Sequence, residues 1–236
     1  LVEMNLLKEL QRKIVQKKRL FSNKHSDDLI IELKEEGIIN SNILDSIKKV
    51  PRELFIGEGF GQLSYENIPL PISCKQTISQ PYVVAYMIDC LKLKKTDKVL
   101  EIGTGTGYQT ALLSYLCKHI YTIEIFNKLY DQAKLNHKKL KLKNISYMLG
   151  NGANGWKEDI LFDAVIISAA AEKTPIKLLK SLKNNRKLIF PKKYPLGVQK
   201  LVLIEKISST KYNYKKLFDV RFVPLLEKNI LESTIQ

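Results

Sequence analysis

A glycine-rich turn between a short apolar segment and a helix is the feature that most constrains the fold. Residues 98–102 (Lys-Val-Leu-Glu-Ile) have the character of a buried strand, and residues 103–107 (Gly-Thr-Gly-Thr-Gly) follow at once. Glycines at this point let the backbone turn tightly into a helix and let a ligand approach the main chain. The turn therefore predicts an α/β fold with a ligand at the carboxyl end of the strand.

The spacing of the three glycines separates several ligand classes. Gly103, Gly105 and Gly107 give G-x-G-x-G, whereas a dinucleotide fingerprint needs G-x-G-x-x-G. A P-loop needs Lys and then Ser or Thr after its last glycine, and this chain has Tyr108-Gln109 there. Pyrophosphate binding is therefore disfavoured, although a nicotinamide cofactor and a glycine turn without function remain as alternatives.

Two carboxylates and an amide accompany the turn. Glu101 stands just before the turn, which favours a ligand with a cationic amine. Glu124 ends the next predicted strand, where a carboxylate accepts hydrogen bonds from ribose hydroxyls in sheets of this class. Asn151-Gly152 follow a third strand, where a polar side chain can meet an adenine edge, although Asn-Gly is also an ordinary turn. This order is typical of S-adenosyl-L-methionine binding.

From Pro81 onward the chain alternates helical and apolar segments. We expect helices over residues 82–92, 111–116, 127–141 and 175–183. We expect strands over residues 98–102, 120–124, 145–149, 162–168, 187–190, 201–206 and 217–223. Such alternation predicts a mostly parallel sheet with helices on both faces, and the two closing strands suggest an antiparallel edge.

Before Pro81 the sequence predicts an N-terminal helical lobe. We expect helices over residues 5–20, from a cap at Ser26 to Gly37, and over residues 42–49, followed by irregular chain over residues 51–74. The prediction is a basic helical extension over residues 1–25 and one domain over residues 26–236. Within that domain, residues 26–75 would form the lobe and residues 76–236 the cofactor-binding sheet core.

Composition disfavours several classes of protein. The formal charge is +15, but only five of the 39 basic residues are Arg, the residue that nucleic-acid surfaces favour, so nucleic acid is an unlikely partner. No apolar stretch is long enough for a membrane span or a signal-peptide core, so we expect a cytoplasmic protein. The three cysteines and three histidines have no spacing typical of a metal site, and we expect none.

Several segments together resemble the protein-L-isoaspartate (D-aspartate) O-methyltransferase family. They are residues 76–81 (Gln-Thr-Ile-Ser-Gln-Pro), 99–110 (Val-Leu-Glu-Ile-Gly-Thr-Gly-Thr-Gly-Tyr-Gln-Thr), 162–171 (Phe-Asp-Ala-Val-Ile-Ile-Ser-Ala-Ala-Ala) and 220–225 (Val-Arg-Phe-Val-Pro-Leu). Residues 50–55 (Val-Pro-Arg-Glu-Leu-Phe) look like the family's lobe. The resemblance runs from about Asp28 to Leu226, and residues 76–81 are its most specific part.

The resemblance implies a class I, Rossmann-like S-adenosyl-L-methionine-dependent methyltransferase that acts as a monomer. Its substrate would be the free α-carboxylate of L-isoaspartyl residues in damaged proteins, with D-aspartyl residues as a further class. The methyl ester would re-form a succinimide and so allow repair. The implied catalytic residue is Ser79. The residues expected at the cofactor are Gln76, Thr77, Ile78, Ser79, Glu101, Gly103, Thr104, Gly105, Thr106, Gly107, Glu124, Asn151 and Gly152.

The chemistry of that reaction fits the candidate site. An α-carboxyl has an ordinary pKa of about 3.5, so the nucleophile is ionised at neutral pH and needs no general base. Residues 76–81 contain neither His nor Cys, in agreement. We expect the Ser79 hydroxyl to donate to the substrate carboxylate; the alternative is a helix N-cap ahead of Pro81.

Three departures from the family pattern stand out. Asn151 replaces the usual Asp, although its amide oxygen can still accept a hydrogen bond. Asn184-Asn185 replace a Gly pair, and Lys192-Lys193 stand within a usual Pro-Val-Gly. The last two leave loop geometry and substrate preference near the end of the sheet open.

Two other functions compete. A nucleic-acid methyltransferase acting on amino groups needs Asn or Asp, two prolines and an aromatic residue in a row, and the nearest approach is Asn67-Ile68-Pro69-Leu70. One acting on carbon needs Pro-Cys, and no cysteine here follows a proline. A basic RNA-binding module without catalysis would use residues 5–20 and bind with a steep salt dependence.

Overall fold

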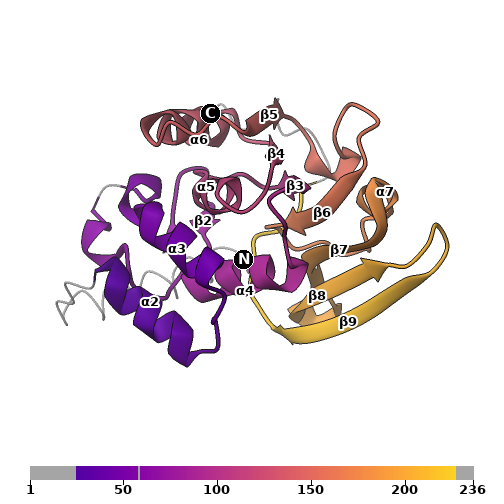
Figure 1. Cartoon of the computed structure of the whole chain (residues 1–236), viewed down its shortest axis with the longest axis horizontal. Helices are drawn as coiled ribbons and strands as arrows, with labels where there is room; N and C mark the ends of the chain where they lie inside the picture. The colour runs from indigo at the N-terminus through magenta and orange to yellow at the C-terminus, as the bar shows by residue number, and fades with distance from the viewer. Residues whose placement is uncertain (1–24, 58, 227–236) are drawn as a thin grey trace.

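Seven strands form the central sheet of the computed structural model, which describes residues 25–57 and 59–226 (Figure 1). The strand order is β5-β4-β3-β6-β7-β8-β9, parallel from β5 to β7 and antiparallel from β7 to β9. The strands are β3 (Lys98–Ile102), β4 (His119–Glu124), β5 (Ile145–Leu149), β6 (Phe162–Ile167), β7 (Leu182–Lys193), β8 (Gln199–Lys206) and β9 (Tyr212–Asp219). The predicted parallel sheet and its antiparallel edge are confirmed.

The sheet has an apolar core on each face because its central strands are buried on both sides. Side chains alternate along a strand, so Val99 of β3 packs into one core while Leu100 and Ile102 pack into the other. All six residues of β6 are buried. Such two-sided burial is what an apolar run flanked by helices predicts.

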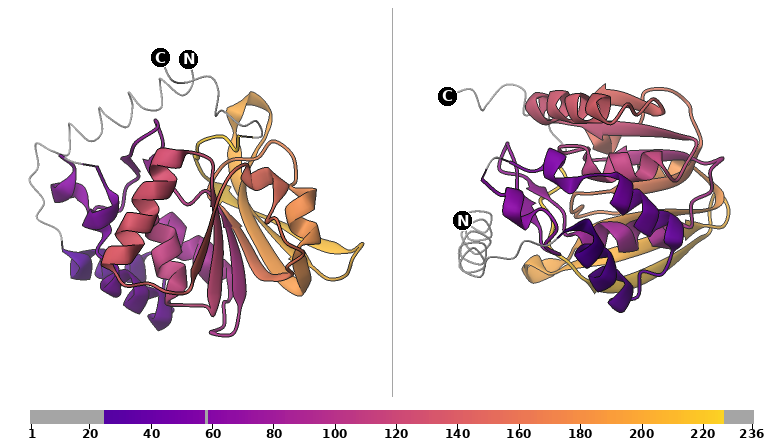
Figure 2. Two further views of the ribbon diagram at one scale, coloured as in Figure 1. Left: turned by 90° about the horizontal axis from the view of Figure 1, so that it is seen from above. Right: turned by 60° about the vertical axis from the view of Figure 1, so that its left-hand side comes forward.

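Helices cover the two faces unequally. The core that contains Val99 includes buried residues of α4 (Pro81–Leu91) and α5 (Tyr108–Ser114). The opposite core includes residues of α7 (Ile176–Lys180), while α6 (Asn127–Lys139) packs against β4 and β5. Figure 2 shows the sheet between these helices, with α5 and α6 on one side and α7 on the other.

The N-terminal lobe packs on the α4 and α5 side of the sheet. Leu29 and Leu33 of α2 (Ser26–Glu35) belong to the same core as Val99, as does Ile47 of α3 (Ser41–Lys49). The predicted irregular region holds only short elements, which are the 3-10 helices η1 (Arg52–Phe55) and η2 (Gly61–Leu63) and the paired strands β1 (Leu70–Pro71) and β2 (Thr77–Ile78). The predicted helix over residues 5–20 lies outside the described residues.

The predicted bounds of two strands were wrong at the antiparallel edge. The strand predicted over residues 187–190 spans Leu182–Lys193, and the preceding helix ends at Lys180. The sequence pattern does not indicate the longer strand, because residues 183–185 are polar and exposed. The backbone is also irregular there, since Asn185 adopts φ +59°. The last strand is Tyr212–Asp219 rather than residues 217–223, since Phe222 hydrogen-bonds through its main chain to the Gln199 side chain instead of to a strand.

The cap of α2 also differs from the prediction. His25 rather than Ser26 is the N-cap residue, and the main-chain N–H of His25 donates to Asp28 Oδ2 at 2.8 Å. The remaining boundaries of the predicted helices and strands agree within a few residues. None of the helices in residues 25–57 and 59–226 has the length and apolar character that crossing a bilayer requires.

Candidate active site

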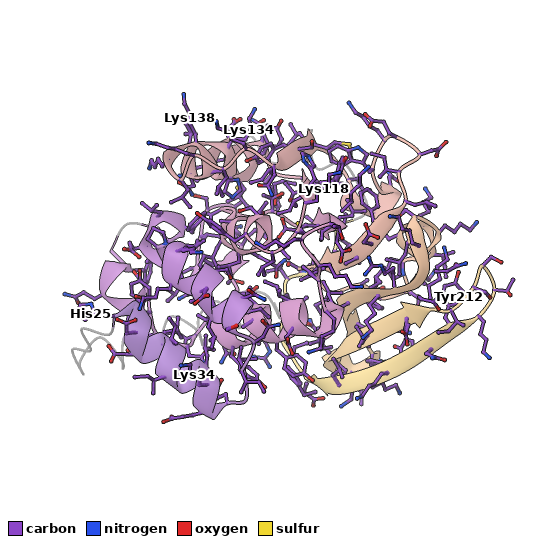
Figure 3. The ribbon with its side chains drawn as sticks, viewed as in Figure 1. His25, Lys34, Lys118, Lys134, Lys138 and Tyr212 are labelled. Carbon is purple, nitrogen blue, oxygen red and sulfur yellow. The ribbon has the colours of Figure 1, made fainter. Side chains whose placement is uncertain are left out.

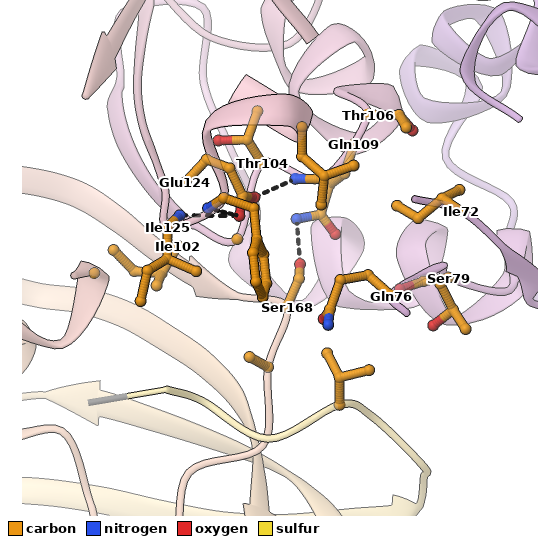
Figure 4. A pocket seen from close by; sticks show the side chains of 18 of the residues that line it. Ile72, Gln76, Ser79, Ile102, Thr104, Thr106, Gln109, Glu124, Ile125 and Ser168 are labelled. Atoms are coloured by element: carbon orange, nitrogen blue, oxygen red, sulfur yellow. Dashed lines mark hydrogen bonds between the residues drawn. The ribbon is translucent and has the colours of Figure 1, made fainter. Parts of the chain in front are cut away.

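A pocket lies at the carboxyl ends of β3, β4 and β6. From β3 the chain continues to β4 on one side while β6 lies on the other, and such a change in strand order leaves a crevice at the carboxyl ends of the strands. The pocket holds about 840 Å³ of space not filled by protein atoms, a figure that includes the open solvent at its mouth. Figure 4 shows Ile72, Gln76 and Ser79 on one side of this pocket and Glu124 and Ile125 on the other. Residues 72–79 and the residues at the ends of β3 and β4 thus line opposite sides of the pocket.

The glycines of the turn after β3 serve two different purposes. Gly103, Gly105 and Gly107 all have φ between +58° and +98°, which disfavours other residues. Gly103 and Gly105 line the pocket, where the missing side chains expose the main chain to a ligand. At Gly107 a Cβ would lie 2.4 Å from His137 Nε2, so this glycine permits close packing of α6.

Two adjacent residues of α6 hold the end of the glycine turn. Asn136 Nδ2 donates to Thr106 O at 3.0 Å, and His137 Nε2 lies 2.7 Å from Gly107 O. Burial lowers the pKa of His137 to about 4, so the ring is neutral at neutral pH. Because a carbonyl can only accept, Nε2 carries the proton and Nδ1 accepts from Tyr147 Oη at 2.7 Å. Side chains of α6 therefore fix the main chain at the end of the glycine turn.

Glu124 presents a carboxylate to the pocket from the end of β4. Its Oε1 accepts from the N–H groups of Ile125 at 2.9 Å and Phe126 at 3.0 Å, and its Oε2 accepts from Gly105 N–H at 2.7 Å. Burial raises the pKa of Glu124, while these three donors oppose the rise. A carboxylate has about four lone-pair positions, so Oε2 keeps one for a ligand hydroxyl. This arrangement fits a ribose.

Glu101 does not line the pocket, contrary to the expectation of a direct contact with a cationic amine. Its position in β3 shares a face with Val99, so the carboxyl points under α5. There it accepts from Thr110 Oγ1, from Thr122 Oγ1 at 2.7 Å and from Gln109 Nε2 at 2.9 Å. Gln109 lines the pocket and also donates to Ser168 Oγ at 2.9 Å (Figure 4). The Thr122 hydroxyl lies 2.6 Å from that of the pocket residue Thr104, so Glu101 reaches the pocket indirectly, through Gln109 and through Thr122.

Burial of Glu101 predicts a pH dependence of stability. It raises the pKa of this carboxyl from 4.5 to about 7, so over that interval the folded state binds more protons than the unfolded chain. The contribution of Glu101 is then most favourable below about pH 4.5 and is lost as the pH rises to about 7. Glu101→Gln should therefore gain stability relative to wild type across this interval. Urea unfolding of both proteins at several pH values measures the difference, and a difference independent of pH would contradict the prediction.

Ser79 lies between β2 and α4, beside the glycine turn. The N-cap of α4 is Gln80 without a side-chain hydrogen bond, so the alternative of Ser79 as helix cap is not what the structure shows. Within residues 25–57 and 59–226 the Ser79 hydroxyl makes no hydrogen bond to the protein, and the residue lines the pocket. The hydroxyl is therefore available to a ligand.

Arg52 fixes the main chain at Ser79 from the protein interior. Its guanidinium is fully buried and donates to Ser79 O at 3.2 Å. It also donates to three carbonyls of residues 64–68, which are Ser64 O at 2.7 Å, Glu66 O at 3.3 Å and Ile68 O at 3.0 Å. Burial lowers the pKa of Arg52 to about 10, which leaves it charged at neutral pH. The charge is thus solvated by main-chain dipoles, and one of them belongs to the pocket residue Ser79.

The structure places ten of the thirteen predicted site residues in the pocket wall. They are Gln76, Thr77, Ile78, Ser79, Gly103, Thr104, Gly105, Thr106, Glu124 and Gly152. Glu101, Gly107 and Asn151 do not line it. Asn151 Oδ1 accepts from Ala153 N–H at 2.9 Å and so caps the short helix η3 (Gly152–Asn154). Gly152 is required there, since a Cβ would lie 2.3 Å from Ile102 Cγ2.

Several pocket residues were not predicted. Ser168 directly follows β6 at the same edge as the glycine turn, and Phe126 follows Glu124 by two residues, so strand ends were a usable signal for both. Residues 223–226 also line the pocket, and the sequence holds no local signal for them. Main-chain hydrogen bonds to Ala170 hold these residues at the pocket. Ala170 N–H donates to Val223 O at 2.7 Å, and Leu225 N–H donates to Ala170 O at 2.8 Å.

Comparison with known proteins decides the family. The family model described as protein-L-isoaspartate(D-aspartate) O-methyltransferase matches residues 23–230, most of the chain. The chain belongs to this family. Its mostly parallel sheet with flanking helices is accordingly the class I, Rossmann-like fold of S-adenosyl-L-methionine-dependent methyltransferases, as the sequence predicted.

Relatives of the protein-L-isoaspartate O-methyltransferase family match over nearly their full lengths. The protein of that name from Parvibaculum lavamentivorans is 43% identical over 208 residues, which are 87% of this chain and 93% of the relative. The one from Proteus mirabilis is 44% identical over 84% of this chain and 94% of its own.

Solved structures of the family agree. A protein-L-isoaspartate O-methyltransferase structure superposes with a TM-score of 0.79 at 25% identity, covering 87% of this chain and 67% of that one. A chain from Plasmodium falciparum given the same name, solved with S-adenosyl-L-homocysteine, has a TM-score of 0.76 at 27% identity. It covers 88% of this chain and all of its own.

Proposed function

We propose that this protein transfers the methyl group of S-adenosyl-L-methionine to the free α-carboxylate of L-isoaspartyl residues in damaged proteins. D-aspartyl residues, which the family description also names, are a further substrate class. The methyl ester is a better leaving group than the carboxylate, so the succinimide re-forms. The observation that carries the proposal is one pocket with the Glu124 carboxylate and glycine turn on one side and the unpartnered Ser79 hydroxyl on the other.

The residues of the pocket fit the cofactor. S-adenosyl-L-methionine supplies an electrophilic methyl group on a sulfonium. Glu124 Oε2 would accept from a ribose hydroxyl, while the main chain at Gly103 and Gly105 would lie against the amino-acid portion. Apolar Ile125 and Phe126 would contact the adenine ring. The fit supports a cofactor at this edge of the sheet.

The protein's task toward the substrate is alignment rather than proton transfer. The α-carboxylate is ionised at neutral pH, so no group has to remove a proton. Orienting its attacking oxygen can lower the barrier by about 7–11 kcal/mol through effective molarity. We assign this orientation to the Ser79 hydroxyl, with the walls of the pocket excluding water from the carboxylate.

Methyl transfer to a synthetic peptide tests the function. The protein is incubated with methyl-labelled S-adenosyl-L-methionine and a short isoaspartyl peptide, and the same peptide with normal aspartate is the control. Base-labile label on the isoaspartyl peptide alone is expected. Binding of the cofactor without label on either peptide would keep the fold and reject the reaction.

Arg52 is proposed as the residue that positions Ser79. Arg52→Lys keeps the charge but cannot reach four carbonyls, so it should lower the unfolding free energy by about 2–4 kcal/mol. It should also lower kcat with little effect on the Kd of the cofactor, because Glu124 and the glycine turn are untouched. Exposed Arg221→Lys is the matched control. Parallel losses in kcat and in cofactor affinity would indicate a purely structural role.

Damaged polypeptides are the partners that this function requires. The monomeric state and the cytoplasmic location stay predictions from the sequence, as does the absence of a nucleic-acid partner. Light scattering on the purified protein measures the first of these.

A further inference from the structure

The antiparallel edge of the sheet carries a cluster of lysines and tyrosines next to the pocket. We call Lys192 and Tyr194, at the end of β7, and Tyr214 and Lys216, on β9, the tyrosine–lysine face. The Tyr194 and Tyr214 hydroxyls lie 2.9 Å apart. Lys192 Nζ lies 5.5 Å from the centroids of both rings, and Lys216 Nζ lies 5.1 Å from that of Tyr194. The four side chains therefore form one contact group.

The two lysines of this face are available to a partner. Neighbouring Lys193 and Lys200 already pair with Glu172, at 2.8 Å, and with Asp219. In residues 25–57 and 59–226, by contrast, no carboxylate pairs with Lys192 or Lys216. A tyrosine ring holds an ammonium in place without neutralising it. The face is thus a pre-arranged pair of positive charges.

The tyrosine hydroxyls add a hydrogen-bond donor. One hydroxyl donates to the other, so only one of the two protons is used between them. The second O–H group remains free to donate. Together with the two ammonium groups it suits carboxylate oxygens, which accept several hydrogen bonds at once.

The face adjoins the pocket wall through main-chain contacts. The main chains of Lys192 and Ala171 form an isolated parallel β-bridge, in which Lys193 N–H donates to Ala171 O at 2.9 Å. The neighbouring Ala170 holds residues 223–225, which line the pocket. Gln199, the first residue of β8, accepts from Phe222 N–H through Oε1 at 2.7 Å and donates to Phe222 O through Nε2 at 3.1 Å. The face and this wall of the pocket are therefore continuous through the main chain.

We infer that the tyrosine–lysine face binds acidic residues that flank the isoaspartyl residue of the substrate, so that the enzyme prefers acidic segments. This inference rests on the proposed function and names its substrate class. Charge complementarity and continuity with the pocket favour a polypeptide over a nucleic acid. The ammonium groups lie over the tyrosine rings, and bases would need those ring faces for stacking.

A pair of isoaspartyl peptides tests the inference, one with flanking glutamates and one with glutamines at the same positions. At low ionic strength the wild type should show a kcat/KM about three- to tenfold higher for the acidic peptide, the scale of two exposed ion pairs. In Lys192→Met/Lys216→Met this ratio should fall to near one, while methylation of the neutral peptide is unchanged. Added salt should reduce the wild-type ratio in the same way.

The matched control is Lys134→Met. Lys134 lies on α6 with its Nζ 4.9 Å from the Tyr130 centroid, so it is also a lysine over a tyrosine. Figure 3 shows it on α6 at the top of the view, apart from Tyr212 of β9 at the right. The variant should keep the wild-type preference, which separates a local contact from the general effect of the chain's positive charge.

The outcomes separate this inference from the proposed function. Methylation of both peptides at equal kcat/KM, or a preference retained in the double variant, would overturn the inference alone. If neither peptide is methylated, the proposed function fails, and anisotropy of a labelled acidic peptide then measures the face directly. Tight binding of a single-stranded RNA that the double variant loses, without binding of the acidic peptide, would also overturn the inference.

Discussion

Ser79→Ala is expected to lower kcat for an isoaspartyl peptide by about a hundredfold, the usual effect of removing one oriented donor at a reacting oxygen. The Ser79 hydroxyl lines the pocket, and the main-chain carbonyl of the same residue is fixed by Arg52. The substrate carboxylate would therefore lose the group that selects its attacking lone pair. The Kd of the cofactor should change less than about twofold, because the Glu124 wall is intact.

Steady-state kinetics with the isoaspartyl peptide and calorimetry with S-adenosyl-L-homocysteine measure the two quantities separately. Ser73→Ala is the matched control, since Ser73 is an exposed serine that does not line the pocket. Unchanged turnover in Ser79→Ala would remove Ser79 from the mechanism. An equal loss in both variants would point instead to the conformation of residues 70–79.

Glu124→Ala is expected to weaken cofactor binding by about 2 kcal/mol or more, which is roughly thirtyfold in Kd. Two effects add. The ribose loses a charged acceptor, and the N–H groups of Gly105, Ile125 and Phe126 lose the carboxylate that now orders them. Glu124→Gln should recover little, because a Gln side chain that kept its oxygen toward Ile125 and Phe126 would turn its NH₂ group toward Gly105 N–H.

Calorimetric titration of S-adenosyl-L-homocysteine measures the loss. Exposed Glu172→Ala removes a carboxylate outside the pocket and should leave the affinity unchanged. Urea unfolding shows whether the variant is folded at the temperature of the titration. A folded Glu124→Ala protein with wild-type affinity would contradict the assignment of Glu124 to the ribose.

Local patterns predicted the elements that carry the site. The strands over residues 98–102 and 145–149 have the predicted bounds, since apolar runs between turn residues are visible without tertiary context. Predictions were poorer at the exposed edge, where β9 mixes polar, aromatic and apolar residues and none of them is fully buried. There the side chains are not sorted by burial, so the period that identifies a strand is weak.

The orientation of individual side chains was harder to predict than their location. Glu101 is next to the glycine turn in sequence, yet it points under α5 because it shares a strand face with Val99. The alternation along β3 was a signal that could have found this. For Asn151 the signal was the Asn-Gly pair, which is also typical of an ordinary turn, and its side chain caps the short helix η3.

The glycine turn, the carboxylates at the strand ends and the family can all be read from the amino-acid sequence, because they depend on residue type and short spacing. The surroundings of these residues depend on how the chain packs. Arg52 reaches Ser79 O across 27 residues, residues 223–226 return to complete the pocket, and β7 and β9 bring together the tyrosine–lysine face. Such contacts arise where packing of the whole core brings distant segments together, so no local pattern encodes them.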